Sequence, residues 1–480
     1  MELLNLKSYI AGEFQDTQSL EENIIDPSNN ELLGQQAFTS EKQLEEALAS
    51  AKRLHQSANW SKNPMERARI LEACADAVGP HYEELAELEA KNTGVCIKDT
   101  KKLMSLVPFI FRGAAAQARE SAPVNVLDKD NQIELLNKPW GPALCLAPWN
   151  APAPIAVHKL ASAMAAGCPA IIKASEYTPY SLQKIIDIIS QITMPAGAIQ
   201  LVHGNQKQGA YLVKDKRIKC VSFTGGLKGG VAISQECAKA MKPVQLELGG
   251  HNPFIVLEGA DVKHAASELI KGMTNLNGQW CRAVGQVLCH DSIKEQLIES
   301  FKEGLANLKI GKASDLESQM GPLIHRQHKM HLEQHLLEYQ SLGAKLIHGD
   351  QSQYQNSCFM SPTLVSGLSI EQDVNELFGP IATIHGFKNN NEAITIVNDS
   401  EFGLAAYVFG PDENIIMNIA RQLETGSVKG NGVTITSLVP AAPRAAWGVS
   451  GLGEEGNKET FEFFQGRTVV GMVNAKAGGN

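Results

Sequence analysis

The sequence ALCLAPWNAPAPIAVHKLASAMAAGCPAIIKA, residues 143–174, decides the fold class. It opens with a short apolar run that predicts a strand over 143–147 and continues with a helical pattern over 155–167 that ends on a glycine. A second apolar run over 170–174 predicts another strand. A strand, a helix and a strand at this spacing predict a right-handed crossover between two parallel strands.

The same alternation continues through a helix, two strands and a helix, at 181–192, 199–204, 220–226 and 231–241. A second unit of the same kind begins after Leu246–Gly250, with a strand at 254–258, helices near 261–275 and 292–308, and strands toward Tyr407–Phe409. We therefore expect an α/β protein with two consecutive doubly wound domains. A ligand cleft is expected between the two domains.

Three segments lie outside these two units. Residues 41–119 show helical periodicity and predict a layer of surface helices. The segments 131–139 and 463–473 are β-like and predict strands with an exposed edge, which either this chain or another subunit must cover.

Composition places the chain among soluble globular proteins. Its 480 residues suggest two or three domains, and hydrophobic, charged and aromatic residues make up 43%, 20% and 6%. Lys and Arg total 43 against 52 Asp and Glu, a net charge of −9, and no basic run stands out. Nucleic acid is therefore an unexpected partner.

The sequence also favours a reducing, cytoplasmic location without a membrane anchor. The longest uncharged stretch, 139–157, contains five prolines and does not suit a spanning helix. The first residues, MELLNLKSYIAGEF, show no export or organelle signal. Nine scattered cysteines without a CxxC pair suit reduced thiols rather than disulfides or a metal site, and we expect no metal.

Two polar clusters follow predicted strands of the first unit. APWN (147–150) places the amide of Asn150 at a strand end, where it can donate to a developing oxyanion, although alone it also fits an ordinary Pro-Trp turn. KASE (173–176) places a carboxylate where it can accept from a nucleotide ribose and repel a 2′-phosphate, which favours NAD over NADP. The alternative for KASE is a solvated loop.

Two glycine-containing stretches carry weaker signals. FTGGLKGG (223–230) predicts a turn between a strand and a helix in which Gly225 and Gly226 let the backbone approach a pyrophosphate, but its spacing is not GxGxxG. LELGGHNP (246–253) carries Glu247 inside an apolar run. Burial of Glu247 would raise its pKa toward the range of a general base, and a Glu exposed at a strand end is the equal alternative.

The remaining motifs surround a cysteine and an aromatic ring. Cys281 in NGQWCR (277–282) follows a turn and is expected to be accessible, with Arg282 favouring its thiolate, although a lone Cys is most often a small core residue. ELFGP (376–380) offers a carboxylate for a second ribose and a wall for a nicotinamide, or simply a turn with a packed ring.

Taken in order, these motifs resemble those of the aldehyde dehydrogenase superfamily, of the NAD(P)-dependent, hydrolytic type. Matches extend over nearly the whole chain and include YIAGEF (9–14), FGLAAYVFG (402–410) and GVSGLGEEG (448–456). The resemblance implies a Rossmann-like cofactor domain formed by residues 1–121 and 140–249. It also implies a catalytic domain at 250–457 and oligomerisation strands at 122–139 and 458–480.

The resemblance also implies residue roles. Cys281 would be the nucleophile, Glu247 the general base, and Asn150 with the backbone N–H of Cys281 the oxyanion hole. An aldehyde would be oxidised through a thiohemiacetal and a thioester, which water activated by Glu247 hydrolyses. The implied assembly is a homodimer or homotetramer. The positions that would bind NAD are Ala147, Trp149, Lys173, Glu176, Gly225, Gly226, Gly230, Leu248, Glu376 and Phe378.

This chain departs from the family pattern near the substrate. Gly226 stands where Ser is common, and Arg444, His158 and Asn275 stand where aromatic residues are frequent. With Trp280, the last three form the expected substrate pocket. The exchange predicts a polar or anionic aldehyde, because Arg recognises carboxylates. The equal alternative is that Arg444 pairs with a structural carboxylate and that His158 is a helix residue whose hydrogen bonds are satisfied.

Three other functions compete with this interpretation. A coenzyme A-acylating dehydrogenase is disfavoured by Glu247, because that position is usually not Glu in such relatives. A non-catalytic protein with the same fold is disfavoured by the intact set of Cys281, Glu247 and Asn150. A zinc-dependent dehydrogenase lacks a suitable Cys and His spacing.

Overall fold

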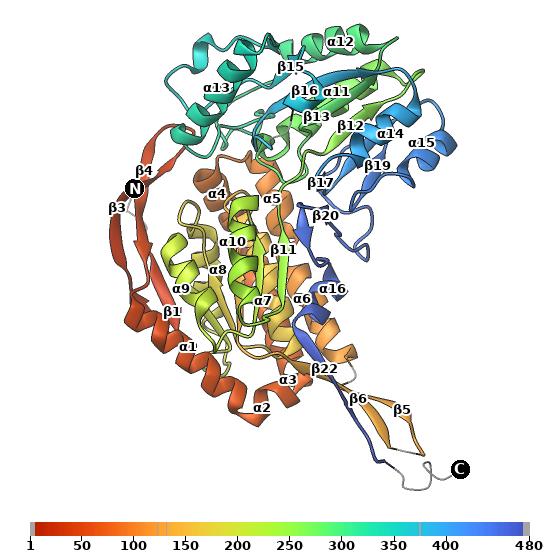
Figure 1. Ribbon diagram of the computed structural model, residues 1–480. Coiled ribbons are helices and arrows are strands. Elements are labelled where there is room, and N and C mark those ends of the chain that lie inside the picture. The colour runs from red at the N-terminus through yellow and green to blue at the C-terminus, as the bar shows by residue number, and fades with distance from the viewer. Residues whose placement is uncertain (1–4, 122, 131, 374–375, 474–480) are drawn as a thin grey trace, which may run out of the picture.

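The computed structural model describes residues 5–121, 123–130, 132–373 and 376–473. Figure 1 shows two lobes, each built around a twisted sheet, and a narrow arm that leaves the lower lobe. The prediction of a mixed α/β fold with parallel sheets is confirmed. Across the described ranges, no helix has the length and apolar character that a membrane crossing requires.

The lower lobe contains an eight-stranded sheet with a parallel centre and antiparallel edges. The central order β9-β8-β7-β10-β11 is that of a doubly wound sheet, because the chain proceeds outward from β7 through β8 to β9 on one side and through β10 to β11 on the other. The full order from edge to edge is β2(Glu13–Asp16), β1(Lys7–Ile10), β9(Ile199–Val202), β8(Ala170–Lys173), β7(Ala143–Leu146), β10(Cys220–Thr224), β11(Val244–Glu247) and β21(Gly451–Leu452).

The helices of this lobe include the predicted surface layer. The crossover helix α7(Pro152–Ala166) begins with Pro at its first turn and ends at Gly167, whose φ of 95° suits glycine. It packs against α3, α6, α8 and α16, so nearly all of its residues are buried. The other helices are α1(Glu41–Gln56), α2(Ala58–Lys62), α3(Pro64–Val78), α4(Tyr82–Thr93), α5(Ile97–Ser105), α6(Val107–Glu120), α8(Tyr180–Ile189), α9(Gln206–Lys214) and α10(Leu227–Ala238).

The upper lobe contains a seven-stranded sheet that is parallel except at one edge. Its order is β14(Lys345–His348), β15(Thr363–Ser366), β16(Ile381–Phe387), β13(Gln286–His290), β12(Pro253–Val256), β18(Ala406–Phe409) and β19(Val428–Gly430). Its helices are α11(Val262–Thr274), α12(Lys294–Ala306), α13(Arg326–Ser341), α14(Asn390–Asn398) and α15(Glu413–Ala420). The second predicted α/β unit is therefore present.

The C-terminal segment returns from the upper lobe to the lower one. After β20(Trp447–Gly448), which pairs with β17(Phe402–Gly403), strand β21 joins β11 of the lower sheet, and α16(Asn457–Phe463) packs on α7. Strand β21 lies within residues 250–457, which were expected to form the catalytic domain, but it belongs to the sheet of the lower lobe.

The arm is a three-stranded sheet of β5(Val124–Asp128), β6(Ile133–Pro139) and β22(Gln465–Val470). The two predicted strands, within 131–139 and 463–473, pair with each other in antiparallel register. Strand β6 lies between β22 and β5, so this chain covers both of its edges, whereas β22 keeps one open edge. A hairpin of β3(Gln18–Asp26) and β4(Glu31–Phe38), which the periodicity did not predict, flanks the lower lobe.

Candidate active site

The fold brings Glu247 and Cys281 close together. Glu247 is the last residue of β11 and is only 7% exposed. Cys281 follows the short 3₁₀ turn η2(Asn275–Gly278), and its thiol lies near enough to the Glu247 carboxylate for each group to shift the pKa of the other. The sequence left open whether Glu247 is buried or exposed at a strand end. The structure shows that it is buried.

The turn before Cys281 is rigidly held. Leu276 and Asn277 adopt left-handed backbone conformations, with φ of 49° and 60°. The Asn277 side chain donates to the carbonyls of Gly94 and Pro322, both at 2.8 Å, and accepts from the N–H of Gly321 at 2.7 Å. These bonds offset the backbone strain and keep the thiol beside Glu247.

The electrostatics favour a protonated thiol, although Arg282 acts in the expected direction. Burial and the neighbouring Glu247 raise the pKa of Cys281 well above its ordinary value, and the charge of Arg282 offsets this only in part. The Arg282 guanidinium instead donates to the Leu404 carbonyl at 3.1 Å and to Ser427 Oγ at 2.8 Å. The pKa of Glu247 is raised as well, first by burial and then by the charge of Glu455.

Asn150 approaches the turn before Cys281 from the other sheet. It follows β7 and donates from Nδ2 to the Gln279 carbonyl at 2.9 Å. Because an amide nitrogen carries two hydrogens, one donor remains for a further acceptor beside Cys281. Asn150, Glu247 and Cys281, which the motifs singled out separately, therefore converge.

The Lys173 and Glu176 side chains form a pair at the end of β8. Lys173 Nζ lies 3.6 Å from Glu176 Oε2 and donates to the carbonyls of Ala174 at 2.8 Å and Gly204 at 2.6 Å. The N–H of Ala147 donates to the Lys173 carbonyl at 3.2 Å, which joins the end of β7 to the same place. A lysine and a carboxylate are thus fixed side by side at the carboxyl edge of the lower sheet.

The glycine turn is shorter than predicted, because α10 begins at Leu227 and includes Gly230. Gly226 is the N-cap of α10, and a Cβ added there would meet no atom within 4 Å. A Cβ at Gly230 would lie 2.6 Å from the Leu248 side chain, so these two residues are in close contact. Gly225 donates its N–H to the Glu247 carbonyl at 3.1 Å. The open helix terminus suits a phosphate.

Glu376 and Phe378 face this region from the upper lobe. Glu376 Oε1 accepts from the N–H of Gly250 at 3.3 Å, and burial raises the pKa of Glu376 to about 7. Phe378 has a φ of 53°, and its ring meets Trp149 edge-on at 5.2 Å. His328, which the sequence did not indicate, lies with Nε2 2.9 Å from the Phe378 carbonyl. The open N-terminus of α10, the Lys173–Glu176 pair and the Trp149–Phe378 wall fit the phosphate, ribose and ring of a dinucleotide.

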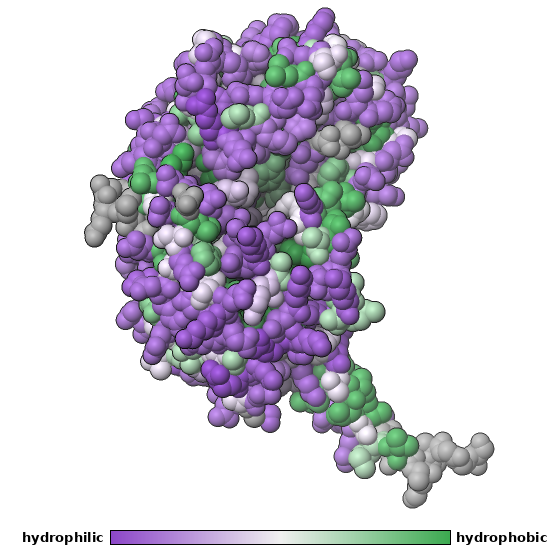
Figure 2. All heavy atoms as spheres, turned by 60° about the vertical axis from the view of Figure 1, so that its left-hand side comes forward, coloured by the Kyte–Doolittle hydropathy of each residue, from purple (hydrophilic) through white to green (hydrophobic). Residues whose placement is uncertain are grey.

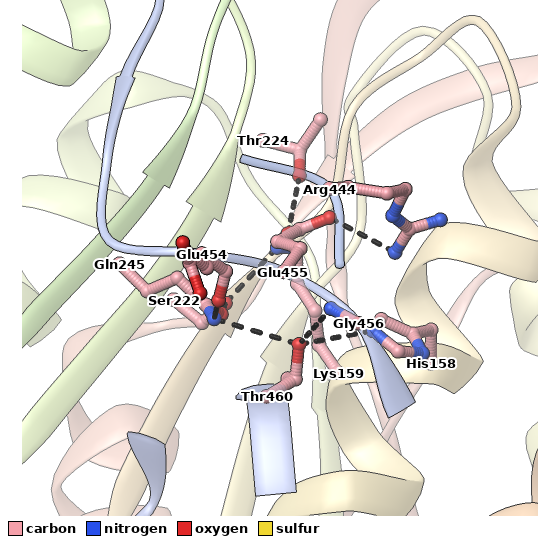
Figure 3. Close-up of polar contacts among 10 residues, drawn as sticks. All are labelled: His158, Lys159, Ser222, Thr224, Gln245, Arg444, Glu454, Glu455, Gly456 and Thr460. Carbon is pink, nitrogen blue, oxygen red and sulfur yellow. Dashed lines mark hydrogen bonds and ion pairs between the residues drawn. The ribbon is translucent and has the colours of Figure 1, made fainter. Parts of the chain in front are cut away.

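A buried polar network lies behind Glu247 and was also missed. Figure 3 shows Lys159 of α7 pointing at Glu455, with Nζ 2.5 Å from Oε1. Lys159 also donates to Ser222 Oγ at 3.0 Å, and Thr224 Oγ1 lies 3.5 Å from Glu455 Oε1. The sequence did contain a signal for this network, since Lys159 is a single Lys inside an apolar helix. A Lys that is buried needs a carboxylate partner.

Comparison with known proteins identifies the family. The model of the aldehyde dehydrogenase family matches residues 14–470 of this chain. The chain belongs to the aldehyde dehydrogenase family. The family and the enzyme class indicated by the motifs are therefore confirmed: the protein is an oxidoreductase that converts an aldehyde to a carboxylic acid.

Individual relatives of this aldehyde dehydrogenase resemble it over almost their full length. It is 32% identical over 465 residues to a non-phosphorylating aspartate-semialdehyde dehydrogenase of Halomonas elongata, covering 95% of this chain and 93% of the relative. It is 31% identical to a succinate semialdehyde dehydrogenase of Acinetobacter baylyi, covering 96% of each. A crystal structure of betaine aldehyde dehydrogenase from Staphylococcus aureus with NAD+ superposes with a TM-score of 0.92 at 28% identity, covering 98% of this chain and 95% of that one.

The four expected substrate residues of this aldehyde dehydrogenase lie in different surroundings. His158 is buried, and its Nε2 lies 3.1 Å from Thr460 Oγ1, which is the structural alternative stated for it. Trp280 is buried in the core of the upper lobe. Arg444 is paired with the Glu455 carboxylate, which is the structural alternative stated for it, and the Arg444 side chain is 38% exposed. Asn275 is half-buried, and its Nδ2 has no partner among the described residues.

Proposed function

We propose that this aldehyde dehydrogenase uses Cys281 as nucleophile, Glu247 as general base and Asn150 as an oxyanion donor, with NAD as the oxidant. The observation that carries the proposal is the convergence of three groups: the Cys281 thiol, the buried Glu247 carboxylate that acts on its pKa, and the Asn150 amide, which donates to the Gln279 carbonyl two residues before Cys281. These three groups supply a nucleophile, a proton acceptor and a hydrogen-bond donor at one point.

The first step is addition of Cys281 to the aldehyde. The Sγ–H proton passes to Glu247, whose raised pKa makes it a competent acceptor, and Sγ bonds to the carbonyl carbon. The carbonyl oxygen becomes an oxyanion, which the Asn150 amide and the Cys281 backbone N–H stabilise. NAD, when bound, accepts the hydride that leaves the substrate carbon.

The second step is hydrolysis of the thioester left on Cys281. Glu247 first releases to solvent the proton that it took from Cys281, and it then takes a proton from a water molecule that attacks the thioester carbon. The carbon–sulfur bond breaks, the Cys281 thiolate leaves, and Glu247 returns the proton to it. Replacement of Glu247 by Gln removes the base for hydrolysis but also lowers the raised pKa of Cys281, so the variant should complete one round of acylation and then stop.

The cofactor contacts follow from the same geometry. The N-terminus of α10 at Gly226 would hold the pyrophosphate, the Lys173–Glu176 pair an adenine-side ribose, and Glu376 with Phe378 the nicotinamide side. The Glu176 carboxylate would repel a 2′-phosphate, which supports NAD over NADP. Replacement of Glu176 by Gln should narrow the ratio of kcat/KM for NAD to that for NADP.

A homodimer or homotetramer joined through the arm is part of the proposal. Strand β22 presents an outer edge, and Val126, Leu127 and Val469 are more than half exposed. Figure 2 shows apolar side chains gathered along the arm, with hydrophilic residues dominating the body beside it. Such a surface is typical of a subunit contact. Light scattering should give a mass above that of one chain.

The direct test is NADH absorbance with purified protein, NAD and a panel of neutral and carboxylate-bearing aldehydes. Cys281→Ala should abolish NADH formation; if it does not, the nucleophile is misassigned. The product should be the free acid without added coenzyme A, because Glu247 activates water. A product that forms only with coenzyme A would establish the acylating alternative instead.

A further inference from the structure

A short connection between the two lobes begins at Glu247 and ends beside Cys281. Strand β11 of the lower sheet ends at Glu247, and β12 of the upper sheet begins at Pro253, so residues 248–252 form this interlobe connection (Figure 1). Cys281 lies in the segment that leads into β13, the neighbour of β12 in the upper sheet. The two groups are therefore carried by different sheets, and their relative position depends on how the connection is held.

Asn252, the last residue of the interlobe connection, is bonded to the backbone of Cys281. Its Nδ2 donates to the carbonyls of Cys281 at 2.8 Å, Ala283 at 2.9 Å and Gly250 at 2.9 Å. The two hydrogens of the amide are shared among these three carbonyls. The same carbonyls fix the orientation of the amide, because its oxygen in place of its nitrogen would be repelled by all of them.

The backbone of Asn252 is held in an uncommon conformation. Its φ of 46° is left-handed although the next residue is Pro253, and a residue before proline favours an extended backbone. Asn252 is 2% exposed, and its Oδ1 has no partner among the described residues. Such a conformation persists only where the surroundings compensate for it, and the compensating bonds here end on the Cys281 segment.

The carbonyls that follow the thiol are all held by side chains. Asn252 binds those of Cys281 and Ala283, and Tyr407 of β18 donates from its hydroxyl to that of Arg282 at 2.8 Å. Tyr407 ties the segment to the upper sheet, to which the segment itself leads. Asn252 ties it to the connection that begins at Glu247.

We propose that Asn252 is a positioning residue for the nucleophile: its amide fixes the Cys281 backbone to the interlobe connection and so holds the thiol within reach of Glu247. This inference rests on the proposed function, because it assigns to Asn252 an effect on the step that Cys281 and Glu247 carry out. Five residues of extended chain can span about 17 Å, so the connection alone leaves the distance between the two groups undetermined. The hydrogen bonds of Asn252 remove that freedom.

The first test replaces Asn252 by Gly, which removes the amide and suits a left-handed backbone. NADH formation in a single turnover should slow by about 10- to 100-fold, the loss expected when a reacting group is displaced by about 1 Å. Asn30→Gly is the matched control, because Asn30 is also left-handed, with a φ of 61°, and lies in the turn between β3 and β4. It should leave the rate unchanged.

A second readout needs neither NAD nor turnover. The rate of alkylation of Cys281 by iodoacetamide, measured against pH, reports the pKa of the thiol. The groups that face this thiol are Glu247, Arg282 and Glu376. In Asn252→Gly the midpoint should move to lower pH by about half a unit or more, because a thiol that is no longer held near Glu247 loses part of the effect that raises its pKa.

A third variant tests the donor itself. Asn252→Asp keeps the size of the side chain but presents a carboxylate to the three carbonyls, and protonation restores one O–H donor. The single-turnover rate of Asn252→Asp, divided by that of the wild type at the same pH, should therefore rise as the pH is lowered from 8 to 6. This variant also keeps the test decisive if Asn252→Gly does not fold.

The outcomes separate the two proposals. A wild type that forms no NADH from any aldehyde, or a Cys281→Ala variant that still forms it, would refute the proposed function. An active wild type with Asn252→Gly within about threefold of its single-turnover rate would overturn the role of Asn252 alone. An unchanged alkylation midpoint in Asn252→Gly, or a rate ratio for Asn252→Asp that does not rise at lower pH, would overturn it as well.

Discussion

Replacement of Lys159 by Met gives the sharpest test of the buried ion pair. Lys159 has no exposed side-chain surface, and Glu455 is 6% exposed, so the carboxylate left behind stays in a poorly solvated place. Arg444 remains 3.1 Å away and continues to stabilise it in part. The expected result is a lower free energy of unfolding at pH 7 without a change of fold.

The pKa of Glu455 gives the magnitude. Burial alone would raise this pKa, but the charges of Lys159, Arg444 and His158 bring it down from 4.5 to about 2. A difference of about 2.5 in pKa corresponds to about 3 kcal/mol. Because Arg444 continues to stabilise the carboxylate in part, we expect Lys159→Met to cost about 2 to 3 kcal/mol, at or just below the lower limit of about 3 kcal/mol for breaking a buried pair.

The pH dependence has a definite sign. The folded pKa of Glu455 lies below its unfolded value, so the ionised group stabilises the protein fully above pH 4.5, and this contribution fades as the pH falls toward 2. Lys159→Met raises the folded pKa. The variant should therefore lose less stability than the wild type when the pH is lowered from 5 to 3.

Urea denaturation at fixed protein concentration, followed by tryptophan fluorescence, measures the effect. The double variant Lys159→Met with Glu455→Gln removes both buried charges and should recover at least half of the loss, since the remaining charge, on Arg444, has a side chain that is 38% exposed and keeps part of its hydration. A double variant as unstable as Lys159→Met, or more so, would show that the loss comes from packing and would refute the electrostatic argument.

Three shorter predictions address the site. Asn150→Ala should lower kcat by about 10²- to 10³-fold while leaving alkylation of Cys281 by iodoacetamide near its wild-type rate, because the oxyanion donor acts only on the substrate; a loss below tenfold would contradict this role. Glu247→Gln should speed alkylation of Cys281 at pH 7, because removing the carboxylate lowers the raised pKa of Cys281 and increases the thiolate fraction. Steady-state NADH formation should collapse in the same variant. Slower alkylation would mean that Glu247 does not destabilise the thiolate. Gly249→Ala should raise the KM for NAD at least tenfold, because its Cβ would lie 1.7 Å from a Glu376 carboxylate oxygen and displace it; an unchanged KM would remove Glu376 from the cofactor site.

Local patterns in the sequence determined most of the architecture. The crossover from β7 through α7 to β8 follows from a short apolar run, a Pro at the helix start, and a Gly at its end, all of which act within a few residues. Asn150, Glu176 and Glu247 could be singled out because polar groups directly after apolar strands are costly unless they have a function. The ordered series of motifs then indicated the family.

Only the tertiary structure decided how distant groups act on one another. Lys159 and Glu455 are 296 residues apart, and their pairing depends on β21 returning to the lower sheet. The state of the Cys281 thiol was misjudged for the same reason: Arg282 is its chain neighbour, but the burial and the Glu247 carboxylate that raise its pKa come from the fold. Periodicity reports which face of an element is buried, whereas charge interactions depend on distance and solvent exclusion, which exist only once the two sheets and the returning segment are in place.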